Sequence, residues 1–192
     1  VNHQASAYYE KEFNDSPTKA NAIKTNTSYY GSIMYGSDSD WYKFTTPSNG
    51  KITLTFDHDV ISSTYSYWEV YLYKSDGVTE IRSWNIYGND ITTSTCEIGL
   101  PAGTYYVEVK GESSYDYSTK TYTLKVNYQA SAYYEKEFND SPSTANTIKT
   151  NTSYYGSIMY SGDPDWYVFE VKNKEKFVVD FLHEIYNSSS KY

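Results

Sequence analysis

The feature that most constrains this chain is an internal repeat. The stretch 4–10 returns unchanged 125 residues later as 129–135, and the correspondence continues without a gap to the end of the chain. A repeat of this length is the size of an ordinary domain. We therefore expect one complete unit over residues 4–128 and the first half of a second, truncated unit over residues 129–192.

The hydrophobic pattern of the first unit is that of β-strands. Ile52, Leu54 and Phe56 alternate with polar threonines, and the same period of two recurs through 68–73 and 122–126. Alternation of this kind is typical of strands that bury one face. The expected strands cover residues 29–35, 41–45, 52–56, 68–73, 81–86, 95–98, 105–109 and 122–126.

Turn signals separate these segments. Asn49-Gly50 and Asp76-Gly77 are dipeptides typical of tight turns, and the first predicts a hairpin. Ser16 followed by Pro17 predicts an N-cap and the first position of a short helical turn, which we expect to run through residues 20–22.

Eight or nine short strands with little helix predict an all-β fold, specifically an antiparallel jelly-roll-like β-sandwich. The whole chain is then a tandem repeat with the second copy truncated. Half a sandwich leaves an apolar face and strand edges without partners. We therefore expect that residues 129–192 do not fold stably as an isolated fragment.

Composition narrows the classes of partner. The chain has 25 Tyr, 7 Phe and 4 Trp, which suit pleated, half-buried surfaces. Its formal net charge of −8 argues against nucleic acid, which selects basic faces, and against adsorption to anionic lipid. No apolar run reaches the roughly 18 residues of a membrane helix, so we expect no membrane insertion.

Acidic side chains gather in two stretches of the first unit. These stretches contain Glu10, Glu12, Asn14, Asp15, Asp38 and Asp40. Ca²⁺ takes about six to eight oxygen ligands, for which carboxylates and an amide oxygen are suited. The residues alone leave two interpretations open. One is a calcium site, and the other is a solvated acidic surface in which Asp15 or Ser16 caps the helical turn.

Four motifs, in this order along the chain, carry a resemblance to a known family. They are Glu10-x-Glu12-x-Asn14-Asp15, Asp38-x-Asp40-Trp41-Tyr42-x-Phe44, Leu100-Pro101-Ala102-Gly103-Thr104-Tyr105-Tyr106-Val107 and Tyr122-Thr123-Leu124-x-Val126. Together they resemble the bacterial pre-peptidase C-terminal domain, a family similar to the collagen-binding domains of secreted bacterial collagenases. The resemblance covers residues 4–128 and the available half of the second unit. It implies a jelly-roll-like sandwich that is appended to secreted hydrolases and has no catalytic residues.

In the collagenase branch the resemblance also implies calcium at the N-terminal linker. Carried over position by position, the expected metal ligands are Glu10, Glu12, Asn14, Asp15, Asp38 and Asp40, with the counterparts Glu135, Glu137, Asn139, Asp140, Asp163 and Asp165. The second unit departs from the first by placing Pro164 between its two aspartates, which removes an amide donor and leaves both carboxylates available.

Tyrosines offer a second kind of candidate site. Tyr71, Tyr73, Tyr106, Tyr115 and Tyr117 are the candidates for an exposed aromatic face. Such a face could stack on sugar rings or hold an extended polypeptide. The alternative is ordinary cross-strand pairing with no ligand. In collagen-binding relatives, the resemblance implies that tyrosines on the sandwich face hold collagen.

The sequence therefore predicts a non-catalytic, calcium-stabilised binding module of a secreted or cell-surface bacterial protein. It would tether that protein to an extracellular polymer, either a protein such as collagen or a polysaccharide, beside neighbouring repeats of the same parent protein. The alternative is a structural stalk or spacer with calcium-rigidified linkers and no ligand. An enzyme is not expected, because the chain has no His-Glu-x-x-His zinc motif and no Gly-x-Ser-x-Gly nucleophile motif. His58 is expected to be a surface residue at a strand end.

Overall fold

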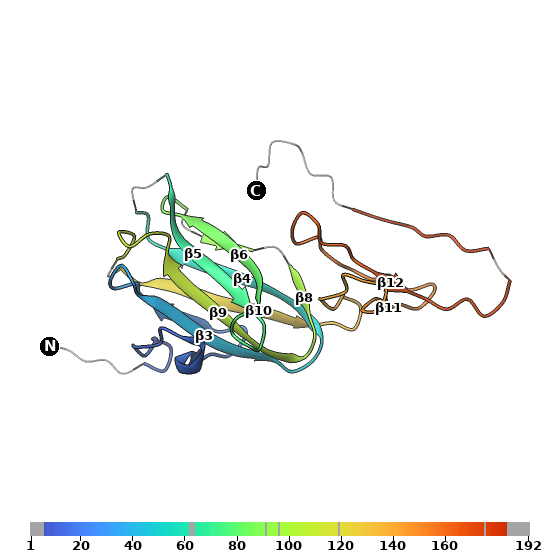
Figure 1. Ribbon diagram of the computed structural model, residues 1–192, viewed down its shortest axis with the longest axis horizontal. Helices are drawn as coiled ribbons and strands as arrows, with labels where there is room; N and C mark the ends of the chain where they lie inside the picture. Colours follow the sequence, from blue (N-terminus) through green and yellow to red (C-terminus); the bar gives the residue numbers. More distant parts are fainter. Residues whose placement is uncertain are drawn as a thin grey trace.

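Ten strands of the first unit pair into two sheets that face each other (Figure 1). The structure is a computed structural model and describes residues 6–61, 64–90, 92–95, 97–118, 120–174 and 176–183. One sheet has the order β1-β3-β9-β5-β6, and the other has the order β2-β10-β4-β7 with β8 beside β4. The strands are β1 (Asn21–Ala22), β2 (Ser28–Gly31), β3 (Ser39–Thr46), β4 (Gly50–His58), β5 (Ser66–Tyr73), β6 (Glu80–Tyr87), β7 (Thr92–Ser94), β8 (Ile98–Leu100), β9 (Gly103–Gly111) and β10 (Tyr122–Ala130). All pairings except β1 with β3 are antiparallel, so the predicted antiparallel β-sandwich is confirmed.

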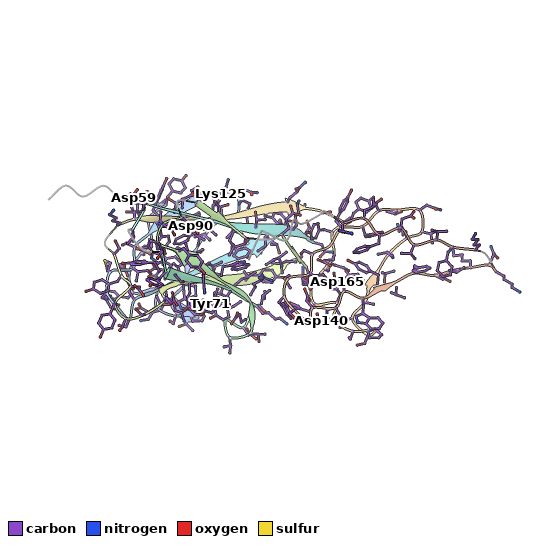
Figure 2. The ribbon with its side chains drawn as sticks, turned by 90° about the horizontal axis from the view of Figure 1, so that it is seen from above. Asp59, Tyr71, Asp90, Lys125, Asp140 and Asp165 are labelled. Atoms are coloured by element: carbon purple, nitrogen blue, oxygen red, sulfur yellow. The ribbon has the colours of Figure 1, made fainter. Side chains whose placement is uncertain are left out.

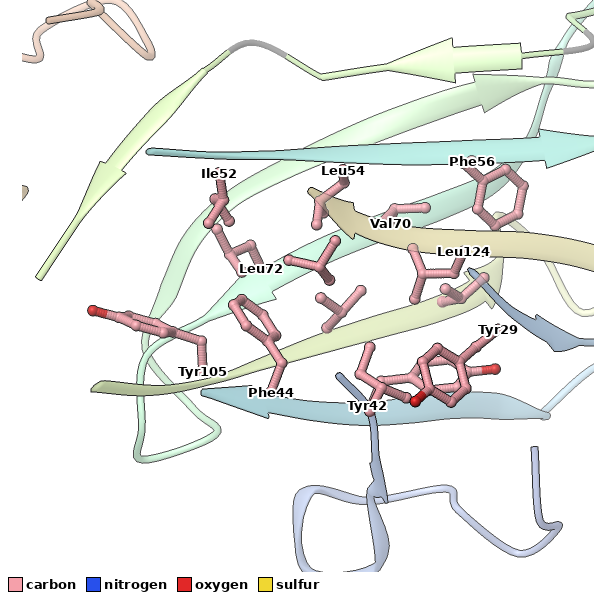
Figure 3. Packing of buried hydrophobic residues seen from close by; sticks show 14 of the residues in the cluster. Tyr29, Tyr42, Phe44, Ile52, Leu54, Phe56, Val70, Leu72, Tyr105 and Leu124 are labelled. Carbon is pink, nitrogen blue, oxygen red and sulfur yellow. The ribbon is translucent and has the colours of Figure 1, made fainter. Parts of the chain in front are cut away.

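The core lies between the sheets and is built from the alternating positions (Figure 3). In β4, Leu54 and Phe56 point inward and pair with Val126 and Leu124 of β10. Phe44 of β3 fills the space from the opposite sheet. Each of these side chains is at most 2% exposed, which places them among the fully desolvated residues that stabilise the fold most.

The turn expected at Asp76-Gly77 is confirmed, and it closes a hairpin. It joins β5 to β6, which are paired along their length. Asp76 Oδ1 accepts hydrogen bonds from the amides of Val78 (2.9 Å) and Thr79 (2.8 Å), and Gly77 has a φ of +66° that favours glycine.

The hairpin predicted at Asn49-Gly50 is wrong. The strands on either side, β3 and β4, belong to different sheets, so this connection crosses from one layer to the other. Gly50 is needed for another reason: a Cβ there would lie 2.3 Å from the carbonyl oxygen of Gln129 on β10. The dipeptide marks a close approach of two strands instead of a hairpin.

Two further expectations are corrected. The helical turn is a 3-10 turn, η1 (Pro17–Lys19), and residues 21–22 are instead β1, because they pair with Tyr42 and Lys43 of β3. The strand expected over 29–35 ends at Gly31, because the amides of Ser32 and Met34 donate to side-chain carboxylates and not to a neighbouring strand.

His58 is also not a surface residue. It is 6% exposed and packs with its ring centroid 4.3 Å from that of Trp68. The inward position follows from the period of β4, in which every second residue from Gly50 to His58 is buried.

The second unit begins where β10 ends and lies beyond the β8 end of the sandwich (Figure 1). Its described strands are β11 (Asn146–Thr147) and β12 (Tyr167–Val168), and residues 184–192 lie outside the described part. Ile52 is 1% exposed, whereas its counterpart Phe177 is 61% exposed. Likewise Phe56 is 2% exposed and its counterpart Phe181 is 84% exposed. Within the described residues of the second unit, the counterparts of these core side chains therefore have no opposing sheet.

We expect that residues 129–192, prepared as an isolated fragment, give no cooperative thermal transition. The physical reason is that Phe177 and Phe181 stay in water, so the fragment has no core to offset the entropy of ordering its chain. Circular dichroism during heating measures this directly, with residues 4–128 as the matched control that should melt cooperatively. A monomeric fragment with a sharp transition would contradict the expectation.

Candidate metal centres and an aromatic face

The acidic residues at the start of the first unit lie together at the beginning of β3. Carboxylate oxygens of Glu10, Glu12 and Asp40 lie within 4.8 Å of one another. Two backbone hydrogen bonds hold the segment in place. The Glu10 amide donates to the carbonyl of Tyr30 on β2 (2.9 Å), and the Trp41 amide of β3 donates to the carbonyl of Asn14 (3.0 Å). The pairing of the N-terminal segment with both sheets therefore brings the two acidic stretches to one point.

Hydrogen bonds orient both oxygens of Glu10 and one oxygen of Asp40. Glu10 Oε1 accepts from the Ser32 amide (2.7 Å), and Glu10 Oε2 accepts from the hydroxyl of Tyr42 (3.1 Å). Asp40 Oδ2 accepts from the hydroxyl of Tyr122 (2.6 Å). Supports of this kind fix the direction of metal ligands in many sites.

The remaining polar atoms of the cluster are buried and have no hydrogen-bond partner among the described residues. They are Glu12 Oε1, Asp38 Oδ1, Asp40 Oδ1, and both the oxygen and the nitrogen of the Asn14 amide. Asn14 and Asp40 have no exposed surface. A buried oxygen without a partner costs about 1–3 kcal/mol, and more when it is charged. A hard cation bound to these oxygens would remove that cost, so the residues present fit calcium.

The second unit repeats this arrangement. Figure 2 labels two of its acidic residues, Asp140 and Asp165. Oxygens of Glu135, Glu137 and Asp165 lie within 4.8 Å of one another, and so do those of Glu137, Asp140 and Asp163. The supports also recur, because Glu135 accepts from the Ser157 amide (2.5 Å) and from the hydroxyl of Tyr167 (3.0 Å). The buried atoms without partners in the described part are Glu137 Oε1 and Oε2, Asn139 Oδ1 and Nδ2, Asp163 Oδ1 and Asp165 Oδ1.

Burial and mutual repulsion raise the pKa values of Glu135, Glu137, Asp163 and Asp165. Burial raises the pKa of Glu137 to about 9, and the charges of Glu135 and Asp163 add to the shift. Burial likewise raises the pKa of Glu12, with added repulsion from Glu10. Without a cation the carboxylates of each cluster therefore resist being ionised together.

The alternative to a calcium site was a solvated acidic surface in which the side chain of Asp15 or Ser16 caps the helical turn. Ser16 precedes η1, yet its side chain makes no cap hydrogen bond. Asp15 Oδ1 accepts from the hydroxyl of Tyr35 at 3.4 Å. The positions predicted for Ser16 and Pro17 are therefore confirmed, but the Ser16 side chain does not cap the turn. Asp15 lies beside the carboxylate of Asp38, whose pKa is raised mainly by burial and further by Asp15.

The outer face of the sheet β1-β3-β9-β5-β6 carries what we call the aromatic row, which consists of Trp41, Tyr71, Tyr73 and Tyr106. Trp41 stacks on Tyr73 with ring centroids 5.0 Å apart, and Tyr73 stacks on Tyr71 at 5.9 Å. Tyr106 meets Trp41 edge-on at 6.4 Å. Three of the five predicted tyrosines therefore lie on one face.

Charged side chains flank the aromatic row. Lys110 Nζ lies 4.6 Å from the ring centroid of Tyr71, and Lys43 Nζ lies 5.8 Å from that of Tyr106. Tyr73 donates its hydroxyl to Glu108 Oε2 (2.9 Å). The face thus combines flat apolar surfaces with donors and acceptors, which is the composition of many polymer-binding surfaces.

Tyr115 and Tyr117 do not belong to this row. Both lie in the connection between β9 and β10, where they are 86% and 48% exposed. The Tyr117 carbonyl accepts from the hydroxyl of Tyr67, at the opposite end of β5 from Tyr73. The prediction of a single face for all five tyrosines is therefore wrong.

Sequence reasoning missed three residues of these sites. Tyr42 and Tyr122 occupy core positions and were assigned only to packing, although a tyrosine in place of phenylalanine is a signal for a buried polar partner. Trp41 was noted only as a member of the second family motif, Asp38-x-Asp40-Trp41-Tyr42-x-Phe44, and as the start of an expected strand. Its position next to inward-facing Tyr42 already placed it on the outer face.

Comparison with known proteins gives a match to one family model, to a collagenase sequence and to several solved structures. Residues 38–111 match the model of the bacterial pre-peptidase C-terminal domain. Collagenase ColT of Clostridium tetani (strain Massachusetts / E88) is 28% identical over 178 residues, which cover 86% of this chain and 17% of that protein. This chain therefore spans only a small part of that relative.

The similar solved structures include a collagenase domain and a carbohydrate-binding module. The pre-peptidase C-terminal domain of a collagenase from Bacillus anthracis is 23% identical, with a TM-score of 0.44 over 56% of this chain and 94% of that one. A carbohydrate-binding module of lichenase 5A from Cellvibrio mixtus, in complex with cellotriose, is 13% identical, with a TM-score of 0.32 over 48% and 72%.

In the described part of the chain, no helix is long and apolar enough to cross a membrane.

The segment that matches the family model begins at Asp38 of the first acidic cluster and ends at Gly111, so it contains the whole aromatic row. The resemblance to the bacterial pre-peptidase C-terminal domain, which the motifs indicated, is confirmed over this segment.

Proposed function

We propose that this chain is a non-catalytic, calcium-stabilised module that tethers a secreted or cell-surface bacterial protein to an extracellular polymer. The observation that carries the proposal is the aromatic row on the outer face of the sheet, where Tyr71, Tyr73 and Tyr106 are half-buried around the buried ring of Trp41. Trp41 of β3 and Tyr73 and Tyr71 of β5 form a continuous stack across the intervening strand β9, with Lys110 and Glu108 beside it.

The shape of the row fits an extended chain better than a compact ligand. The stack crosses from β3 to β5, two strands away, so it covers roughly 10 Å at the usual strand spacing. The half-buried rings of Tyr71, Tyr73 and Tyr106 can contact prolines or sugar rings with their exposed parts, and Lys110 and Glu108 can contact carbonyl or hydroxyl groups. The similarity to a collagenase favours a protein polymer such as collagen over a polysaccharide.

Calcium has a structural task in this proposal. The ligands would be the six acidic and amide residues at the head of each unit, from Glu10 to Asp40 and from Glu135 to Asp165. When bound, the ion neutralises charges that otherwise repel one another. Because Asp40 belongs to the strand that carries Trp41, the ion also fixes the start of the binding face.

The proposal is tested by sedimentation with insoluble polymers. We expect the chain to bind collagen fibrils, and the Tyr71→Ala and Tyr106→Ala variants each to weaken binding by about tenfold, which is typical of an aromatic residue at the centre of an interface. Tyr115→Ala is the matched control, since it removes an exposed tyrosine that lies off the row. Equal binding by all three variants would refute the role of the row.

A stalk or spacer remains a second candidate function, and one observation favours it. The second unit packs directly on the end of the first, where the Glu137 amide donates to the Gly99 carbonyl at 3.0 Å. Units joined in this way would form a stiff rod without recognising any ligand. Absence of binding to collagen, cellulose and chitin in the sedimentation assay would favour the stalk.

A further inference from the structure

We call the start of each unit its head, which runs from Tyr9 to Asp40 in the first unit and from Tyr134 to Asp165 in the second. Equivalent residues of the two heads have different surroundings. Tyr134 is 7% exposed and Met159 is 2% exposed in the second unit. Their counterparts in the first unit, Tyr9 and Met34, are 53% and 41% exposed. The difference arises because the head of the second unit lies against the end of the first, whereas the head of the first unit is open.

Backbone carbonyl groups of the first unit hold the head of the second unit through hydrogen bonds. Besides the bond from Glu137 to Gly99, the hydroxyl of Ser157 donates to the carbonyl of Glu97 (2.5 Å). The approach at Gly99 is close, because a Cβ there would lie 2.2 Å from the carbonyl oxygen of Glu135. Gly99 therefore allows β8 to receive the second unit.

Aromatic rings and charges complete this contact. Lys51 Nζ lies 5.7 Å from the ring centroid of Tyr134, and Lys74 Nζ lies 3.3 Å from that of Phe138. The positive charge of Arg82 acts on Asp163 of the second acidic cluster. The end of the first unit thus presents Lys74, Arg82 and the ion pair of Lys51 with Glu97 to the acidic and aromatic head of the second.

We propose that the open head of the first unit, formed by Tyr9, Phe13 and Met34, is a docking face for the β8 end of another copy of this repeat. Phe13 is 71% exposed, and its counterpart Phe138 is the ring that Lys74 covers. The occupant is thus identified by a contact that the chain already makes with the same residues 125 positions later.

Two contacts that shape the covered head are also present in the open head. Tyr9 bridges to Tyr30 as Tyr134 bridges to Tyr155. The Met34 amide donates to Asp38 (2.5 Å) as the Met159 amide donates to Asp163 (2.7 Å). Another copy would therefore meet a surface that is preformed at Tyr9 and Met34. Phe13 has a φ of +62°, which Phe138 does not share, so docking would require a backbone change at this residue. This inference concerns a different surface from the aromatic row and needs neither calcium nor a polymer.

The two methionines of the chain provide the test, because they occupy equivalent positions and report burial separately. We expect hydrogen peroxide to oxidise Met34 about tenfold or more faster than Met159, since a buried side chain reacts only through local opening. In a chain extended by a copy of residues 4–128 placed directly before Gln4, Met34 should slow to the rate of Met159. The methionine of the added copy is replaced by leucine so that peptide mass spectrometry reports Met34 alone. An unchanged rate at Met34 would overturn the proposal.

A glycine variant makes the test specific to the contact. Gly99→Ala in the added copy should return Met34 to its fast rate, and the same change in the original chain should speed the oxidation of Met159. Gly103→Ala is the matched control, because a Cβ there would meet its nearest atom, of Tyr105, at 3.4 Å and touch nothing of the second unit. If Gly99→Ala leaves the protected methionine slow, the end at β8 is not the docking partner and the proposal fails.

Discussion

The melting temperature of this chain in a chelator is expected to rise by roughly 10 °C or more when calcium is supplied at about one hundred times its dissociation constant. A ligand that binds only the native state at this ratio stabilises it by about 2.7 kcal/mol per site. For a chain of this length, each kcal/mol shifts the melting temperature by about 2–4 °C. Two acidic clusters, each with buried oxygens that have no partner among the described residues, give the expected rise.

Variants of single ligands separate the two clusters. Glu12→Gln should remove the part of the calcium-dependent rise that belongs to the first cluster, Glu137→Gln the part that belongs to the second, and the double variant all of it. Asp90→Asn is the matched control, because it removes one exposed carboxylate that belongs to neither cluster. Differential scanning calorimetry in calcium and in chelator measures these shifts. A melting temperature that does not respond to calcium would contradict the whole metal assignment.

The layout of strands could be predicted from the sequence because the period of two is a local signal. Residues 52–56 and 122–126 were assigned correctly from alternation alone, and both became inward-facing core strands. The assignment failed at Asn49-Gly50, where the local signal for a turn does not say whether the next strand joins the same sheet or the other one. That choice depends on contacts distant in sequence, such as the close approach of Gly50 to Gln129.

The candidate sites were predictable to different degrees for the same reason. The acidic residues recur as a set 125 residues apart, so their grouping could be proposed before any pairing of strands was known. The aromatic row could not be assembled in this way. Trp41 meets Tyr73 only because β9 lies between β3 and β5 and aligns them, and no local pattern encodes that order. For this reason Trp41 was missed, and Tyr115 was wrongly added.

A second large effect is expected in the pH dependence of the calcium-free protein. The pKa of Glu137 is raised by burial to about 9, whereas an ordinary glutamate titrates near 4.5. Burial also raises the pKa values of Glu10 and Asp165. The native state therefore keeps protons that the unfolded chain releases. The resulting stabilisation is complete below the ordinary pKa and is lost as the pH rises through the pKa of the folded state.

In chelator, the melting temperature should accordingly fall by about 5 °C or more between pH 5 and pH 8, in contrast to the behaviour of carboxylates that are paired in the native state. Asp76 has a pKa lowered by hydrogen bonds from Thr79 to about 2, but its opposite contribution is already complete above pH 5. Calcium should flatten the curve, because the ion takes the place of the protons at the clusters. Glu137→Gln should weaken the fall in chelator, since the amide cannot ionise. A melting temperature that rises from pH 5 to pH 8 without calcium would mean that the carboxylates are compensated by the protein itself, and calcium would then have no charge left to balance.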